Sequence, residues 1–196
     1  MQDRLSASLS EAEKVLREFV SDPNTLDAMK AIVDCIANCF KSGGKALSCG
    51  NGGSMADAMH FAEEFSGRFR EDREPYPAIA LSDPTHLTCV ANDYGFEHVF
   101  SRQVQALGKP GDILLVLSTS GNSPNVLKAA EVARLKQVTV IGMLGKGGGK
   151  LAHLCDLHLH APGYGSDRIQ EIHMMALHII IEAVELEMKR ESHGVD

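Results

Sequence analysis

The sequence is poor in aromatic residues and has no tryptophan: aromatic side chains make up 5% of its 196 residues. It also has no surplus of basic residues, because 19 Lys and Arg stand against 26 Asp and Glu and give a formal net charge of −7. Proteins that hold a nucleic-acid backbone regardless of its sequence need such a surplus, so we predict no nucleic-acid partner. No segment approaches the roughly 18 uninterrupted apolar residues of a membrane-spanning helix, and no apolar run typical of a signal peptide follows the N-terminus. We therefore expect a cytoplasmic protein with no membrane partner.

The five cysteines follow no pattern typical of disulfides or metal knuckles. Their number is odd, their spacing is wide, and no Cys-x-x-Cys pair occurs, which indicates reduced thiols. Cys35 and Cys39 lie four residues apart on a predicted helix and therefore share one face, as small core residues commonly do.

Hydrophobic periodicity predicts helices at both ends of the chain. Residues 2–20 carry apolar side chains three and four apart, and a second helix is expected over 24–42. A long helix over 167–189 is apolar around much of its circumference, so it is either central to the fold or buried by another subunit; together with the N-terminal helical arm, this favours an oligomer. The apolar stripe of the first helix consists of Leu5, Leu9, Ala12, Leu16 and Phe19.

Between these helices the pattern changes to short, continuously apolar runs separated by Gly- or Ser-rich turns and helical segments. Such runs are typical of parallel strands that helices cover on both faces. No repeat or linker divides the chain, so we expect one domain over 1–196, with 1–42 as a helical arm and 43–196 as an α/β core. The runs are Ala46–Cys49, Ala78–Leu81, Ile113–Leu117, Val138–Met143 and Leu154–Leu159.

One strand is followed by a loop that is unusually rich in hydroxyl groups. The segment Ser118–Pro124 contains Ser118, Thr119, Ser120 and Ser123, and Pro124 suits the first position of a helix with Ser123 as its cap. Exposed amides, hydroxyl donors and the positive end of a helix together bind an anion without a lysine. An ordinary Ser-rich turn would need only one hydroxyl, so we favour a phosphate site.

A second loop, Gly50–Ser54, is rich in glycine and precedes a helix expected near Met55, with Ser54 as its cap. It does not fit the dinucleotide fingerprint, because Met55 stands where the last glycine is needed. The run Gly145–Lys150 fails the same template and lacks the spacing of a P-loop. We therefore predict no nucleotide cofactor, and a phosphorylated small molecule remains as the ligand.

Ionisable side chains cluster on two of the predicted helices. His60 and Glu64 lie four residues apart on one face, and the last helix carries Gln170, His173 and His178. Imidazole and carboxylate groups form metal sites or acid–base pairs. Two alternatives remain at this point: His60 and Glu64 form a solvated pair, and His178 is a hydrogen-bonded core histidine.

Five segments occur together in this chain: Gly50–Ser54, Asp57–Glu64, Asn92-Asp93, Ser118–Ser123 and Arg168–His173. Together they resemble the phosphoheptose isomerases of the sugar-isomerase (SIS) domain family, and the resemblance covers essentially the whole chain. It implies a three-layer α/β sandwich with a five-stranded parallel sheet, a homotetramer, and active sites built across subunit boundaries. It also implies an aldose–ketose isomerase that converts sedoheptulose 7-phosphate to D-glycero-D-manno-heptose 7-phosphate for ADP-heptose and the lipopolysaccharide core.

The resemblance also implies roles for individual residues. Glu64 and His178 would be the catalytic pair. We hypothesise that Glu64 removes a proton from carbon and that His178 moves protons at the oxygens or at the opposite face. One zinc ion per subunit would be held by His60, Glu64, Gln170 and His178. The phosphate would be bound by Ser118, Thr119, Ser120 and Ser123, and the sugar would be lined by Asn51, Gly52, Gly53, Glu64, Asn92, Asp93 and Gln170.

Helix geometry adds one expectation about the metal ligands. Gln170 and His178 are eight residues apart, which is about 12 Å along a helix and roughly 80° around it. We therefore predict that these two ligands of one metal do not come from the same copy of the helix.

Two other functions are compatible with this fold. Some SIS-domain proteins are non-catalytic adaptors, one of which binds the replication initiator DnaA, but that adaptor lacks counterparts of Glu64 and His178. Another SIS isomerase with a different sugar-phosphate substrate is the second alternative, and the helical arm and Asn92-Asp93 argue for the heptose enzyme.

Overall fold

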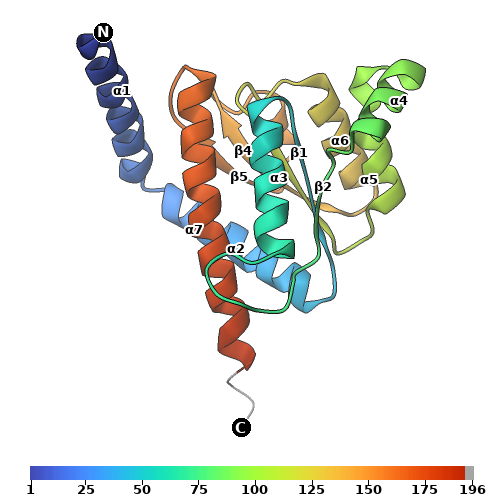
Figure 1. Ribbon diagram of the computed structural model, residues 1–196. Helices are drawn as coiled ribbons and strands as arrows, with labels where there is room; N and C mark the ends of the chain where they lie inside the picture. The colour runs from blue at the N-terminus through green and yellow to red at the C-terminus, as the bar shows by residue number, and fades with distance from the viewer. Residues whose placement is uncertain (193–196) are drawn as a thin grey trace.

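Five parallel strands form the centre of the fold, as the sequence predicted. In the computed structural model, which describes residues 1–192, their order across the sheet is β2-β1-β3-β4-β5 (Figure 1). The strands are β1 Ala46–Gly50, β2 Ala78–Ala80, β3 Ile113–Ser118, β4 Thr139–Gly145 and β5 Leu157–Ala161. Every residue of β1 and β3 is buried, because helices cover both faces of the sheet.

Helices pack in a layer on each face of this sheet. On one face lie α2 Thr25–Lys41, α3 Gly53–Ser66 and α7 Ser166–Ser192, and on the other lie α4 Pro84–Tyr94, α5 Ser101–Leu107 and α6 Pro124–Leu135. Strand β3 serves both layers, since Leu115 and Leu117 face the first and Leu114 and Val116 face the second. Short 3₁₀ turns occur at Phe96–His98 and Leu151–His153.

Helix α1, Gln2–Ser21, extends away from the sheet beside α7 (Figure 1). The apolar stripe of α1 is only partly covered within this chain: Phe19 is buried, whereas Leu5 and Leu9 are 59% and 73% exposed. Val15, which lies outside the predicted stripe, is buried instead. The reason is tertiary: Ser8 and Glu11 of α1 bond to Arg168 of α7, but no element within residues 1–192 covers the face that carries Leu5 and Leu9.

Several boundaries differ from the predicted ones, most of them by one to three residues at an end of an element. The fifth strand begins at Leu157 and not at Leu154, because residues 151–153 form a 3₁₀ turn that the bond from the Leu154 amide to the Leu151 carbonyl closes at 2.9 Å. Helix α3 begins at Gly53, before the expected start near Met55. Within residues 1–192, every helix is too short or too polar to cross a bilayer.

Candidate functional site

The topology of the sheet places two of the predicted loops side by side. Strands β1 and β3 are neighbours, but the chain passes from β1 outward to β2 and from β3 outward to β4. Ligands in open parallel sheets bind beyond the carboxyl ends of the strands at such a reversal of direction. The loops that leave this point are the Gly-rich loop after β1 and the hydroxyl-rich loop after β3.

A pair of amides joins these two loops. The side chains of Asn51 and Asn125 exchange two hydrogen bonds of 2.8 Å, although they are 74 residues apart in the sequence. Asn125 is 2% exposed and lies in the first turn of α6. Sequence reasoning missed Asn125; the only signal was an amide side chain just after Ser123-Pro124, at a position where asparagine is not favoured for helix propensity alone.

The hydroxyl-rich loop has the organisation of an anion site. The buried Ser118 hydroxyl accepts a bond of 3.1 Å from the Gly121 amide, and the Asn122 amide donates to the Ser120 hydroxyl at 3.2 Å. Ser123 occupies the N-cap position of α6 but makes no capping bond to the helix, so its hydroxyl remains close to Ser118 at 3.5 Å. The positive end of α6 and its free amides therefore face a group of hydroxyls.

The loop after β1 differs from the predicted one in its helix cap. Gly52, with φ +57°, holds the N-cap position of α3, so Ser54 lies inside the first turn and is buried. The chain turns at Gly52 because a glycine adopts this left-handed backbone without strain. The Ser54 hydroxyl instead accepts a bond of 3.3 Å from the amide of Gln170 on α7.

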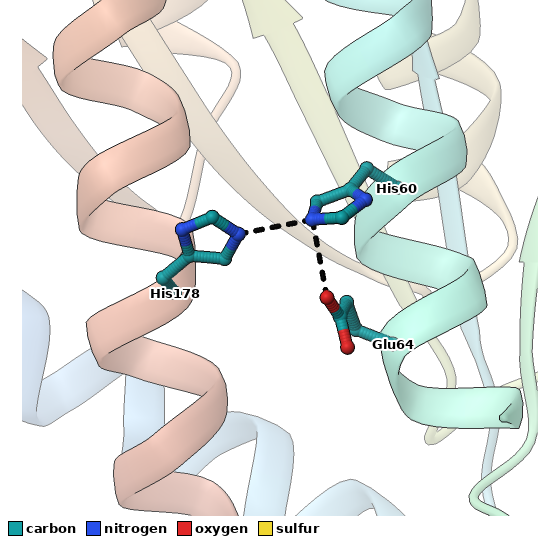
Figure 2. A group of neighbouring side chains, drawn as sticks. All are labelled: His60, Glu64 and His178. Carbon is teal, nitrogen blue, oxygen red and sulfur yellow. Dashed lines mark hydrogen bonds and ion pairs between the residues drawn. The ribbon is translucent and has the colours of Figure 1, made fainter. Parts of the chain in front are cut away.

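The predicted ionisable residues converge between α3 and α7 (Figure 2). His60 Nε2 lies 2.9 Å from His178 Nε2 and 3.1 Å from the carboxylate of Glu64. Residues 118 positions apart meet because α3 and α7 lie side by side with the same direction, as the contacts of Gln170 with Ser54 and of Phe69 with His178 also require. The ring of Phe69 stacks on that of His178 at 5.7 Å and an angle of 26°.

The arrangement of these three side chains suits a metal ion. One atom from each of His60, Glu64 and His178 lies within 4.8 Å of the others. A neutral imidazole nitrogen either donates or accepts, so His60 Nε2 cannot donate to both of its neighbours at once. Two imidazoles and one carboxylate are a common donor set of catalytic zinc, and a cation among them would be bound by all three lone pairs.

Asp57 adds a further negative group one turn before His60. One of its carboxylate oxygens is buried without a hydrogen-bond partner in the described part of the chain. Burial raises the pKa of Asp57 to about 6, and the charge of His60 opposes this shift.

The remaining predicted residues lie apart from this cluster. Gln170 contacts Ser54 and the backbone of Gly53, at the N-terminal end of α3. Asn92 and Asp93 are exposed on the last turn of α4, and their side chains bond to one another at 2.7 Å. A cavity of about 480 Å³ opens next to them and includes residues of both loops. It is lined by Asn51, Tyr94, Gly95, Phe96, Glu97, Ser123, Pro124 and Asn125. Of these residues Tyr94, Phe96 and Glu97, like Asn125, were not predicted.

His173 is a buried titratable group close to these elements. It is 1% exposed, and neither ring nitrogen has a hydrogen-bond partner among the described residues. Burial lowers its pKa to about 4; the backbone of Leu144 opposes this shift and the charge of His160 adds to it. His173 is therefore a neutral part of the core at physiological pH.

This shift predicts a pH-dependent stability. Because the folded pKa of about 4 lies below the unfolded value of 6.5, the stability is complete above pH 6.5 and is lost as the pH falls toward 4. We expect the free energy of unfolding to fall by about 3 kcal/mol over this range through His173 alone. Urea unfolding of the protein and of His173→Phe at each pH measures the difference between the two curves. Parallel curves would contradict the assignment.

Comparison with known proteins relates the chain to one family. A family model described as the SIS domain matches residues 9–145. The phosphoheptose isomerase of Vibrio cholerae is 54% identical over 188 residues, which cover 95% of this chain and 98% of that protein. The solved structure of a phosphoheptose isomerase from Neisseria gonorrhoeae superposes with a TM-score of 0.88 at 38% identity, covering 94% of this chain and 98% of that one. The solved structure of a phosphoheptose isomerase from Francisella tularensis superposes with a TM-score of 0.89 at 35% sequence identity, and the match covers 93% of this chain and 97% of that one.

Proposed function

Because this chain belongs to the phosphoheptose isomerases of the SIS domain family, we propose that it converts sedoheptulose 7-phosphate to D-glycero-D-manno-heptose 7-phosphate with Glu64 and His178 as its catalytic residues. The observation that carries the proposal is the convergence of Glu64, His60 and His178 between α3 and α7. It brings a carboxylate and an imidazole to one point, and this isomerisation requires a base for carbon and a proton carrier for oxygen.

The residues have distinct roles in the proposed reaction. Glu64 removes a proton from C1 of the ketose, which leaves an enediol, and returns the proton to C2. His178 moves a proton between the oxygens of C2 and C1, so that the ketone becomes a hydroxyl and C1 becomes the aldehyde. Each proton transfer of this kind contributes roughly 10²- to 10⁴-fold to the rate.

Substrate binding is assigned to the two loops at the reversal point of the sheet. The phosphate binds to Ser118, Thr119, Ser120 and Ser123 at the start of α6, and this placement is supported by the hydroxyls and amides that face one another there. Asn51, Gly52, Gly53, Asn92, Asp93 and Gln170 line the sugar together with Glu64.

The residues that would hold a zinc ion are His60, Glu64 and His178, together with Gln170. Bound there, zinc supplies a Lewis acid for the oxygens of the substrate. The donor types of the first three residues support this assignment.

We further propose that the protein is a homotetramer whose active sites are shared between subunits. Glu64 lies on α3 eleven residues after Gly53, which is about 16 Å along the helix axis from the phosphate-side loop. Gln170 contacts the loop end of α3, whereas His178 contacts His60 in the middle of α3 and Phe69 beyond its end, so a site that uses both calls for two copies. The exposed Leu5 and Leu9 of α1, and the exposed Ile179 of α7, supply apolar surface for such an assembly.

The proposed reaction is tested by incubating the protein with sedoheptulose 7-phosphate and following the aldose by NMR. We expect formation of the aldose, its loss after treatment with a chelator, and its recovery on addition of zinc. Fructose 6-phosphate serves as the control substrate and should react far more slowly. Turnover of another ketose phosphate but not of the heptose would contradict the substrate assignment.

Shared sites predict complementation between two inactive variants. Glu64→Gln removes the base, and Ser120→Asp places a negative charge in the phosphate loop. If each active site takes these two residues from different copies, coexpressed variants regain roughly a quarter of wild-type turnover, because mixed assemblies contain intact sites. No recovery in mixed assemblies that mass spectrometry has verified would contradict a shared site.

A further inference from the structure

The segment Gly148–Leu151, which follows β4, lies directly against the hydroxyl-rich loop. The two segments leave the same edge of the sheet, because β3 and β4 are paired and Ser118 is in register with Leu144. The sequence singled out this Gly-rich run, but its spacing fits no nucleotide motif, and the isomerase reaction described above gives it no role.

Glycines allow the two backbones to touch. A Cβ at Gly121 would lie 1.9 Å from the carbonyl oxygen of Gly148. A Cβ at Gly149 would lie 2.7 Å from the carbonyl of Gly121 and 2.6 Å from the side-chain nitrogen of Asn122. Both glycines also have positive φ values, +64° for Gly121 and +55° for Gly149. The contact therefore tolerates no side chain at Gly121 or at Gly149.

Hydrogen bonds fix the orientation of the hydroxyl-rich loop across this contact. The Leu151 amide donates to the Gly121 carbonyl at 3.0 Å, and the Lys150 amide donates to the side-chain oxygen of Asn122 at 3.1 Å. The Asn122 side chain in turn donates to the Ser120 carbonyl at 2.8 Å. The carbonyl oxygens of Ser120 and Gly121 are thus both engaged by donors and are not presented to an anion, which they would repel.

We propose that Gly148–Leu151 is a positioning element for phosphate binding: it holds the carbonyls of the loop away from the ligand and leaves hydroxyls and amides to face it. The inference rests on the proposed function, which assigns the phosphate to Ser118–Ser123. The segment does not touch the phosphate itself and acts through Gly121 and Asn122.

The test compares Gly149→Ala with Gly147→Ala. Both positions have a left-handed backbone, φ +55° and +81°, so both variants are expected to lose a similar amount of thermal stability. A Cβ at Gly147 meets no atom of the described chain within 4 Å, whereas a Cβ at Gly149 would push against Gly121 and Asn122. We expect Gly149→Ala to raise the KM for the sugar phosphate and the inhibition constant of inorganic phosphate by about 10- to 100-fold, with a smaller change in kcat. Gly147→Ala should leave both constants near their wild-type values.

A second variant tests the same contact in case Gly149→Ala does not fold. Asn122→Ala removes the acceptor of the Lys150 amide and the donor to Ser120 without adding an atom, and it should raise the same two constants. Equal constants in Gly149→Ala and Gly147→Ala, with competition by phosphate intact in the wild type, would overturn the positioning role and leave the proposed function standing. If phosphate does not compete in the wild type and Ser120→Asp leaves the KM unchanged, the phosphate site fails and this inference fails with it.

Discussion

Replacement of Glu64 by glutamine is expected to lower kcat by about 10²- to 10⁴-fold, because an amide cannot take a proton from carbon. The fold should persist, since glutamine has the same shape and the Glu64 side chain is mostly buried, with 13% exposed beside His60. We expect the thermal unfolding midpoint to change by less than about 4 °C. Steady-state kinetics with sedoheptulose 7-phosphate and a thermal melt measure the two quantities.

The neighbouring residue supplies a matched control. Glu63 is also close to His60, at 3.7 Å from Nδ1, but its side chain is 64% exposed, and His178 lies at the other ring nitrogen of His60, Nε2. Glu63→Gln should therefore retain turnover within about twofold of the wild type, as surface substitutions generally do. The metal content of both variants separates the loss of a base from the loss of a ligand. Near-normal turnover by Glu64→Gln would remove Glu64 from the catalytic role.

Replacement of Arg73 by methionine is expected to lower the free energy of unfolding by about 3–5 kcal/mol. Its guanidinium pairs with Glu185 at 2.6 Å, and both side chains are only 7% exposed. The same group donates to the carbonyls of Phe65 and Glu64 at 2.9 and 2.8 Å, so it also satisfies the end of α3. Removal of the arginine leaves a buried carboxylate and two carbonyls without their donor. Urea unfolding at one fixed protein concentration measures the loss, because the stability of an oligomer depends on concentration.

Arg70 provides the comparison on the same segment. It pairs with Glu182 on α7, but these side chains are 63% and 38% exposed, so Arg70→Met should cost less than about 1 kcal/mol. The double variant Arg73→Met/Glu185→Met should recover part of the lost stability, because it leaves no unpaired buried charge. Equal losses for Arg70→Met and Arg73→Met would contradict the importance of burial.

Local patterns in the sequence predicted most of the secondary structure. Continuous apolar runs indicated β1, β3 and β4 because strands covered on both faces have no polar side. The alternation of strands and helices indicated a parallel sheet, which the structure confirms. The hydroxyl-rich loop before Pro124 was identifiable because its signal is also local: a helix cap and its neighbours are determined within one turn of chain.

Local patterns were misleading where the answer depended on distant neighbours. The stripe on α1 predicted an amphipathic helix, but periodicity shows only that a face is apolar and not which element covers it, and Leu5 and Leu9 of this stripe are exposed. Ser54 was predicted as a cap, but Gly52 turns the chain before it.

The sequence by itself therefore determined the fold class, the two candidate ligand-binding loops and the residue types of the candidate site. Only the tertiary structure decided which of those residues meet. His60 lies beside His178, Asn51 pairs with Asn125, and Gly121 touches Gly148 across intervals that no periodicity spans. The physical reason is that the periodicity of a sequence reflects the regular geometry within one helix or strand. These contacts instead depend on the order of the strands and on the direction of α7 beside α3.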